Sequence, residues 1–261
     1  NHPDTIASFM AVNSLGAVWS CCSPDFGIES IANRFEQLKP GILLAHKRYS
    51  YNGKDYIQEK KIKELQIRLP SIKKTIVFDS TFDSWNLNSN YWIDFEFVSV
   101  KFDHPIWVLF SSGTTGKPKA ITHGTGGMLL EQYKSHSLHQ NIMNGDRFFW
   151  NTTTGWMMWN YAIGSFLCGA TLCLYDGSAN FPDIGVQWRF AKDAKINHFG
   201  NGSPMFIASM KQNCKDVSNE NLKFIKTIGA TGSPLSIEAF KWLQKKLPST
   251  QIISLSGGTD V

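Results

Sequence analysis

The segment Pro105-Ile106-Trp107-Val108-Leu109-Phe110 runs directly into Ser111-Ser112-Gly113-Thr114-Thr115-Gly116-Lys117-Pro118-Lys119. The first part is apolar enough for a buried β-strand, and the second supplies four hydroxyl groups, two glycines and two lysines. Proteins bind polyphosphates with converging backbone N–H groups, hydroxyls and a lysine, and glycines let the backbone come close without a Cβ clash. The segment therefore predicts a phosphate-binding loop at the end of a strand.

This loop does not have the Walker A pattern, which requires GxxxxGK followed by Ser or Thr. Gly113 and Gly116 are too close together for that pattern, and Pro118 follows Lys117. A flexible surface turn is the structural alternative. The concentration of hydroxyls, glycines and lysines directly after an apolar strand favours a functional loop instead.

Around the loop, helix and strand patterns alternate along the whole chain. Helices are expected near 3–15, 28–38, 57–69, 124–138, 157–167, 184–193, 203–212 and 236–246, and strands near 17–19, 42–45, 75–78, 105–110, 147–151, 171–175, 196–199, 224–228 and 251–255. The alternation predicts an α/β fold with parallel-rich sheets flanked by helices, in which ligands bind at the carboxyl ends of strands. Residues 79–104 lack periodicity, so we expect two α/β subdomains, residues 1–103 and 104–261.

The composition restricts the class of protein. The 261 residues are 42% hydrophobic and carry a net charge of +5, which suits a globular protein and lacks the dense basic stripe of a nucleic-acid binder. No apolar run reaches the roughly 18 residues of a membrane span, and no signal peptide is visible. The five cysteines form no CxxC pair, which is typical of reduced thiols, so we expect a cytoplasmic location. Both chain ends look interrupted, and we expect a part of a longer protein.

Three further segments follow the loop in a recognisable order. The loop and these segments together resemble the signature of the adenylate-forming superfamily, which includes acyl-CoA synthetases, luciferases and adenylation domains. The matching stretches are Ser111–His123, Thr154-Gly155-Trp156, Gly229–Leu235 and Ser256-Gly257-Gly258-Thr259-Asp260. A narrower resemblance, to the acetoacetyl-CoA synthetases, rests on Leu15–Gly27, on the turn Tyr51-Asn52-Gly53-Lys54 and on the Ser-Gly-Gly-Thr-Asp segment.

The resemblance implies a two-step reaction with ATP, Mg²⁺ and coenzyme A. A carboxylate attacks the α-phosphate of ATP to give an acyl-adenylate and pyrophosphate, and the thiolate of coenzyme A then displaces AMP. Positioning and charge stabilisation would supply most of the catalysis in the first step. By the same resemblance the chain is an incomplete part of the large domain of an acid–thiol ligase, without the start of that domain. A small mobile carboxyl-terminal domain, which carries a lysine that contacts the attacking carboxylate, is absent, so we expect the chain alone to be inactive or severely impaired.

The resemblance also assigns roles to residues of this chain. The phosphates of ATP would be held by Ser111, Ser112, Gly113, Thr114, Thr115, Gly116 and Lys117, with Thr114, Thr115 and Lys117 at the β- and γ-phosphates. Gly232, Ser233 and Pro234 would line the adenine and ribose. Thr259 would donate to the α-phosphate and Asp260 would hold Mg²⁺, where the family usually has the longer Glu. Thr114, Lys117, Thr259 and Asp260 are the expected catalytic residues.

The acid pocket is expected to be lined by Trp156, Met157, Met158, Thr231 and Gly257. Acetyl-CoA synthetases resemble this chain but carry Trp at the position of Gly257, where it closes the pocket around acetate. Glycine there leaves room for acetoacetate, and also for propionate, butyrate or larger acids. A tight turn at Gly257-Gly258 is the structural alternative.

Other interpretations stay open at this point. The chain could be a non-catalytic nucleotide-binding module, whereas a phosphotransferase would need a Walker or kinase signature. His123 could contact substrate or serve as a structural hydrogen-bonding residue, and Asp146-Arg147 is expected to be a turn before a strand. Trp159 and Tyr161 are expected in the core. The sequence does not fix the oligomeric state.

Overall fold

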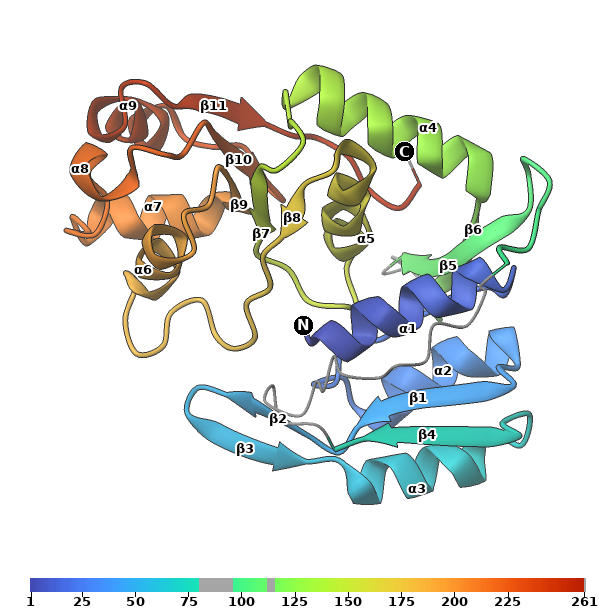
Figure 1. Cartoon of the computed structure of the whole chain (residues 1–261). Helices are drawn as coiled ribbons and strands as arrows, with labels where there is room; N and C mark the ends of the chain where they lie inside the picture. The colour runs from blue at the N-terminus through green and yellow to red at the C-terminus, as the bar shows by residue number, and fades with distance from the viewer. Residues whose placement is uncertain (80–95, 112–115, 261) are drawn as a thin grey trace, which may run out of the picture. The chain divides into compact units, whose positions relative to one another are not determined.

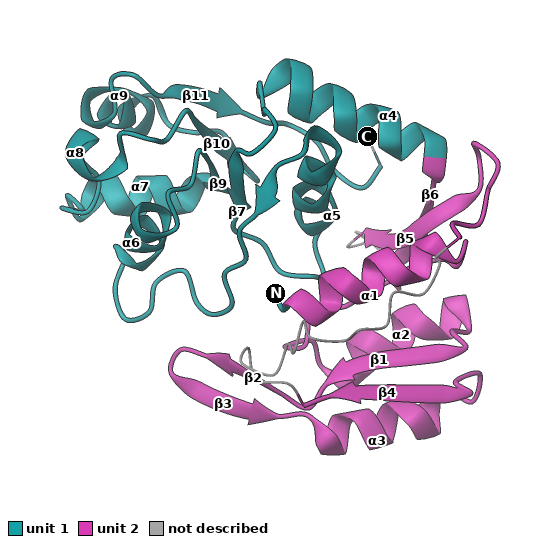
Figure 2. Cartoon of the chain, in the orientation of Figure 1, with its two compact units in different colours: residues 1–2, 126–261 teal, residues 3–125 magenta. Residues whose placement is uncertain are grey.

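The computed structural model describes residues 1–79, 96–111 and 116–260, and the chain divides into two compact units (Figure 2). One unit comprises residues 3–125, and the other comprises residues 1–2 and 126–261. The predicted α/β class with parallel-rich sheets is confirmed, with the largest parallel sheet in the second of these units. The subdomain division predicted between residues 103 and 104 stays a prediction.

The unit of residues 3–125 combines short sheets with three helices (Figure 1). Its helices are α1 (Pro3–Ser14), α2 (Ile28–Leu38) and α3 (Glu59–Arg68), and its strands are β1 (Ile42–His46), β2 (Arg48–Tyr51), β3 (Lys54–Ile57), β4 (Lys74–Phe78), β5 (Pro105–Ser111) and β6 (Lys119–Gly124). β1 pairs with β4 in parallel, and β2–β3 and β5–β6 are antiparallel pairs. One core cluster joins α2, β1 and α3 through Ile31, Ala32, Phe35, Leu43, Ile62, Leu65 and Leu69.

Two of these strand pairs were not expected from the sequence. β2 and β3 meet at Asn52-Gly53, whose φ angles of 52° and 70° suit the two-residue turn that Asn-Gly favours in hairpins. β6 lies where a direct passage from the loop to a helix was expected. From Ala120 to His123 its residues alternate between exposed and half-buried positions, which is the period-2 pattern of a strand with one covered face.

The second unit contains a parallel sheet in the order β11-β10-β9-β7-β8. Its strands are β7 (Arg147–Trp150), β8 (Thr171–Leu172), β9 (His198–Gly202), β10 (Thr227–Thr231) and β11 (Gln251–Ser254). Its α-helices are α4 (Thr125–Lys134), whose first residue is the last of the other unit, α5 (Met157–Gly164), α6 (Val186–Asp193), α7 (Ser203–Lys211), α8 (Asn219–Leu222) and α9 (Ile237–Lys246). A π-helical turn (Ser135–His139) extends α4, and a 3-10 turn (Ser165–Cys168) extends α5.

The two faces of this sheet carry different cores. Phe149, Phe199, Ile228 and Ala230 point to one face and pack with α6, α7, α8 and α9 in the largest cluster. Phe148 and Trp150 point to the other face and pack against α5 through Tyr161 and Ala162. The expected core positions of Trp159 and Tyr161 are confirmed, since their side chains are buried. No helix of the described residues is long and apolar enough to cross a membrane.

Candidate functional site

The predicted phosphate loop connects the two strands of the β5–β6 hairpin in the unit of residues 3–125. Ser111 ends β5 and pairs with Lys119 at the start of β6. Ser112, Gly113, Thr114 and Thr115 lie outside the described residues. Gly116 and Lys117 are exposed, and the side chain of Gln37 donates to the backbone oxygen of Pro118 at 3.0 Å. The Lys117 ammonium is therefore available to an anionic ligand.

His123 lies on β6, opposite Trp107 on β5. The indole Nε1–H of Trp107 donates to Nδ1 of His123 at 2.7 Å. This hydrogen bond joins the side chains of the two strands across the hairpin. Of the two roles left open by the sequence, the structural one is the role that this contact supports.

In the other unit, the predicted adenine-binding segment continues β10 at its carboxyl end. Gly232 has a φ of 82°, a left-handed conformation that favours glycine, and no described atom lies within 4 Å of where its Cβ would be. The hydroxyl of Ser203, at the start of α7, donates to the backbone oxygen of Ser233 at 2.6 Å. Ser233 and Pro234 are themselves exposed. The segment is thus anchored by its backbone and leaves its outer surface free.

The segment that carries Gly257 and Asp260 follows β11, the neighbour of β10. It is fixed to β10 by two hydrogen bonds, from the hydroxyl of Thr231 to the backbone oxygen of Leu255 at 3.0 Å and from the backbone N–H of Leu255 to the oxygen of Ala230 at 2.8 Å. Gly257 and Asp260 are exposed, and Thr259 is half-buried. A Cβ at Gly257 would meet no described atom within 4 Å, so open space surrounds this glycine.

The predicted acid-pocket residues of α5 divide into two groups. Met157 and Met158 are half-buried and pack with Leu255 against the cluster of Phe148, Trp150 and Tyr161. Trp156 precedes the helix and is 63% exposed. The methionines and Thr231 thus lie within one unit, near the carboxyl ends of β7 and β10, whereas Trp156 points to solvent.

Sequence reasoning missed a ring of amides at this carboxyl edge. Asn151 Nδ2 donates to Asn201 Oδ1 at 3.1 Å, Asn201 Nδ2 donates to Gln187 Oε1 at 2.7 Å, and Gln187 Nε2 donates to Asn151 Oδ1 at 2.8 Å. Gln187 and Asn201 are fully buried. Each side-chain amide donates a hydrogen bond to the carbonyl oxygen of the next one. The ring therefore holds the ends of β7 and β9 and the start of α6 in a fixed arrangement.

A second missed network lies at the opposite, amino edge of the sheet. Asp146 accepts hydrogen bonds from Lys226 Nζ at 2.6 Å and from His198 Nε2 at 2.9 Å, and Thr227 Oγ1 lies 2.7 Å from His198 Nδ1. Burial would raise the pKa of Asp146, but the hydrogen bonds from Lys226 and His198 outweigh it and hold the pKa below its usual value. Burial lowers the pKa of His198. The expected turn at Asp146 is present, but this carboxylate also joins three strands.

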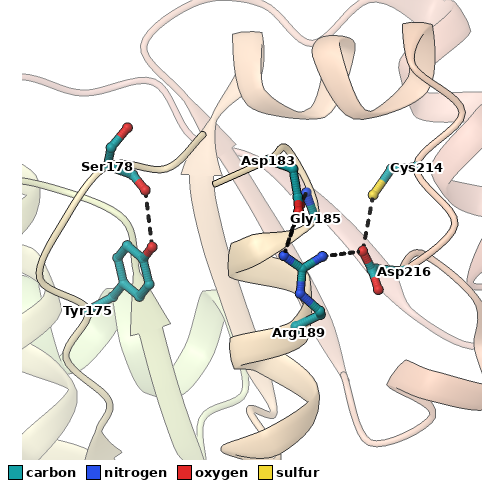
Figure 3. A network of polar contacts seen from close by, with 7 residues as sticks. All are labelled: Tyr175, Ser178, Asp183, Gly185, Arg189, Cys214 and Asp216. Carbon is teal, nitrogen blue, oxygen red and sulfur yellow. Dashed lines mark hydrogen bonds and ion pairs between the residues drawn. The ribbon is translucent and has the colours of Figure 1, made fainter. Parts of the chain in front are cut away.

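A third network precedes α6 and is shown in Figure 3. Arg189 donates to both carboxylate oxygens of Asp183, at 2.9 and 3.0 Å, and to Asp216 at 2.8 Å. Asp183 also accepts from the backbone N–H of Gly185 at 2.8 Å, close to the helix start, where a negative charge is favourable. A Cβ at Gly185 would lie 1.9 Å from Asp216 Oδ2, so the network leaves room only for glycine. These contacts order the loop before α6 and play no part in the predicted site.

The phosphate-loop hairpin and the glycine-rich segments after β10 and β11 are the parts expected of an enzyme that binds a nucleotide. Residues 1–261 match the AMP-binding enzyme family, and the chain belongs to that family. It is 37% identical to acetoacetyl-coenzyme A synthetase of Rhizobium meliloti (strain 1021) over 274 residues, and 31% identical to malonamoyl-CoA synthetase vrtB of Penicillium aethiopicum over 297 residues.

A solved structure, acetoacetyl-CoA synthetase from Streptomyces lividans, superimposes with a TM-score of 0.93 at 38% identity. Each comparison covers 100% of this chain but only 41–42% of the relative. The chain therefore spans less than half the length of the curated relatives that it matches. The recognition of the adenylate-forming superfamily from sequence is confirmed, and so is the similarity to acetoacetyl-CoA synthetases.

Proposed function

We propose that this chain forms the nucleotide-binding part of an AMP-forming acid–thiol ligase that activates a short carboxylic acid with ATP and transfers it to coenzyme A. The observation that carries the proposal is the pair of anchored glycine segments at 232 and 257, which follow the neighbouring strands β10 and β11 of one sheet. Lys117, in the unit of residues 3–125, is exposed beside the phosphate loop. The family membership supports the reaction type.

In this proposal the nucleotide is held by the residues to which the resemblance to the adenylate-forming superfamily gives that role. The loop Ser111–Lys117 and the side chain of Lys117 bind the β- and γ-phosphates, and Gly232, Ser233 and Pro234 contact the adenine and ribose. Thr259 donates to the α-phosphate. A Mg²⁺ ion usually binds one or two carboxylates together with substrate phosphates. The exposed carboxylate of Asp260 suits such a site.

The proposed acid is a short one with a carbonyl group on its third carbon, acetoacetate in first place. Two relatives of this chain carry the names of an acetoacetyl-CoA and a malonamoyl-CoA synthetase. Both acyl groups have a carbonyl at that carbon, followed by either a methyl or an amino group. The open space at Gly257 suits an acid longer than acetate.

The test uses the complete enzyme that contains this chain. Acid-dependent exchange between pyrophosphate and ATP measures adenylate formation, and release of AMP with coenzyme A present measures the thioester step. We expect acetoacetate to give the highest kcat/KM in a panel with acetate, propionate, butyrate and malonamate. Absence of exchange with every acid would instead identify a non-catalytic nucleotide-binding module.

A further inference from the structure

The six-membered ring of the Trp150 indole covers two glycines of neighbouring strands. The sheet register places Trp150 of β7 beside Gly200 of β9, and Gly200 beside Gly229 of β10. A Cβ at Gly200 would lie 2.0 Å from Cε3 of the indole, and a Cβ at Gly229 would lie 2.5 Å from its Cη2. No side chain could occupy either position while the indole stays where it is. The two glycines therefore form a shelf for Trp150.

This shelf lies directly below the predicted acid pocket. Side chains two positions apart along a strand point to the same face of a sheet. Thr231, a predicted pocket residue, follows Gly229 by two positions and pairs with Gly202 of β9. The side chains of Thr231 and Trp150 therefore lie on the same face of the sheet. Thr231 is two residues nearer the carboxyl edge than Gly229, which is level with Trp150.

The side walls of the predicted acid pocket come from residues that pack against the cluster of Phe148, Trp150 and Tyr161. Met157 and Met158 of α5 and Leu255 after β11 pack against this cluster, and Tyr161 meets the indole edge-on with ring centroids 5.7 Å apart. The indole itself is 4% exposed. The predicted acid pocket, if it extends inward from Thr231 between the two methionines and Leu255, meets the indole of Trp150 at its inner end.

We propose that Trp150 sets the depth of the acid pocket and restricts the enzyme to short acids, an inference that rests on the function proposed above. Without the indole, Gly200 and Gly229 would leave a hollow in the face of the sheet, because neither has a side chain to fill it. Gly257 leaves the side of the pocket open, and Trp150 closes its floor. Together they select an acid longer than acetate but with no long alkyl tail.

The decisive experiment replaces Trp150 in the complete enzyme by Phe and by Leu and measures kcat/KM for acetoacetate, butyrate, hexanoate and octanoate. A methylene in a hydrophobic pocket changes kcat/KM by about 10- to 200-fold. We expect Trp150→Leu to raise the ratio of hexanoate to acetoacetate by about tenfold or more, and Trp150→Phe to raise it less. The KM for ATP should change less than the acid ratio, because Gly232, Ser233 and Pro234, the proposed adenine and ribose contacts, lie beyond the row of Trp150 and Gly229.

Trp188 provides the matched control, since it is fully buried on the opposite face of the same sheet. Trp188→Phe should leave the acid ratio unchanged even if it lowers the melting temperature. The converse variant is Gly229→Ala, whose new methyl group would lie 2.5 Å from the indole and must displace it from the sheet face. It should lower kcat/KM for acetoacetate more than for acetate.

Three results would overturn the inference. They are a folded Trp150 variant with an unchanged acid profile, an equal broadening in Trp188→Phe, and a wild-type enzyme that already uses hexanoate as well as acetoacetate. The last result needs no variant, so it decides the question even if every substitution at Trp150 prevents folding. Failure of the proposed function is a separate outcome, in which the wild-type enzyme shows no acid-dependent pyrophosphate exchange at all.

Discussion

Lys226 donates a hydrogen bond to Asp146 at 2.6 Å, although the two residues lie 80 positions apart in the sequence. Asp146 also accepts from His198, 52 positions away, so one buried carboxylate joins the amino ends of β7, β9 and β10. The exposed fraction of the Asp146 side chain is 9%, whereas that of Lys226 is 52%. The structure therefore depends more on the carboxylate than on the ammonium group.

The first prediction is that Asp146→Asn destabilises the sheet unit. The amide keeps the size of the side chain but removes the charge that both donors face, which corresponds to a loss of about 1–3 kcal/mol. Thermal unfolding should show a lower melting temperature. Asp183→Asn is the matched control, because Asp183 pairs with Arg189 at an exposed site and its loss should matter less. An equal fall in melting temperature in both variants would contradict the prediction that the buried Asp146 network stabilises the unit more than the exposed Asp183–Arg189 pair.

The second prediction concerns acid sensitivity and His136. This imidazole is fully buried, stacks on Tyr161 with centroids 4.2 Å apart, and donates from Nδ1 to the backbone oxygen of Gln132. Burial lowers its pKa from 6.5 to about 4. The unfolded chain binds a proton at this group below pH 6.5 and the folded chain does not, so stability is lost as the pH falls from 6.5 to about 4. The loss from this group is about 3 kcal/mol, at about 1.4 kcal/mol per pH unit.

Two variants test this assignment. His136→Gln removes the titrating group and should flatten the dependence of melting temperature on pH between 6.5 and 4. His139→Gln changes an exposed histidine of the same π-helical turn and should keep the wild-type slope. His198 adds to acid sensitivity in the same direction, since burial lowers its pKa as well. A His136→Gln protein with an unchanged slope would show that the loss arises elsewhere.

Local sequence patterns predicted much of the fold, and the exceptions have physical reasons. β7 and the helices α5 and α6 have apolar or amphipathic patterns bounded by turn residues, so these patterns were sufficient. The prediction for β9 covered only His198 and Phe199, because the strand continues through Gly200, Asn201 and Gly202. β6 was missed because the alternation of apolar and polar residues after Lys119 is too short to identify a strand. These residues also follow the loop signature directly and were interpreted as part of the ligand-binding motif. The four-residue helix α8 is too short for a periodic signal.

The candidate site was less predictable than the fold. Motifs pointed to Gly232 and Gly257, because glycine-rich segments at strand ends carry a local signal. The partners of Asp146 gave no such signal, since His198 and Lys226 meet it only through sheet pairing. The same holds for Trp150, whose position on Gly200 and Gly229 depends on the register of three strands. Contacts that arise between strands far apart in sequence require the structure.

The third prediction tests the side of the acid pocket. Gly257→Trp should fill the open space at this position and shift the complete enzyme towards acetate, raising the ratio of kcat/KM for acetate to that for acetoacetate by about tenfold or more. Gly258→Trp, also without described neighbours within 4 Å of its Cβ, adds the same bulk one residue away and should leave that ratio unchanged. If Gly257→Trp leaves the ratio of kcat/KM values among the acids unchanged, Gly257 does not line the acid pocket, and the tight-turn interpretation holds.

The fourth prediction concerns the carboxylate of Asp260. In the proposed site Asp260→Asn removes a Mg²⁺ ligand, so pyrophosphate exchange should fall by about tenfold or more and require a higher Mg²⁺ concentration. Asp260→Glu restores the residue usual in the family and should retain activity with the wild-type Mg²⁺ requirement. If Asp260→Asn keeps both the rate and the Mg²⁺ dependence of the wild-type enzyme, the ion is held elsewhere.

The last prediction compares this chain with the complete enzyme. Residues 1–261 correspond to 42% of acetoacetyl-CoA synthetase from Rhizobium meliloti, and the resemblance places the lysine that contacts the attacking carboxylate outside this range. In the proposed function, ATP binding uses the phosphate loop and the segments at 232 and 257, whereas thioester synthesis also uses that lysine and a path for coenzyme A. We therefore expect residues 1–261 to give no thioester in a coupled assay with ATP, acetoacetate and coenzyme A, while the complete enzyme turns over. Normal turnover by residues 1–261 alone would show that the residues described here are sufficient for both steps.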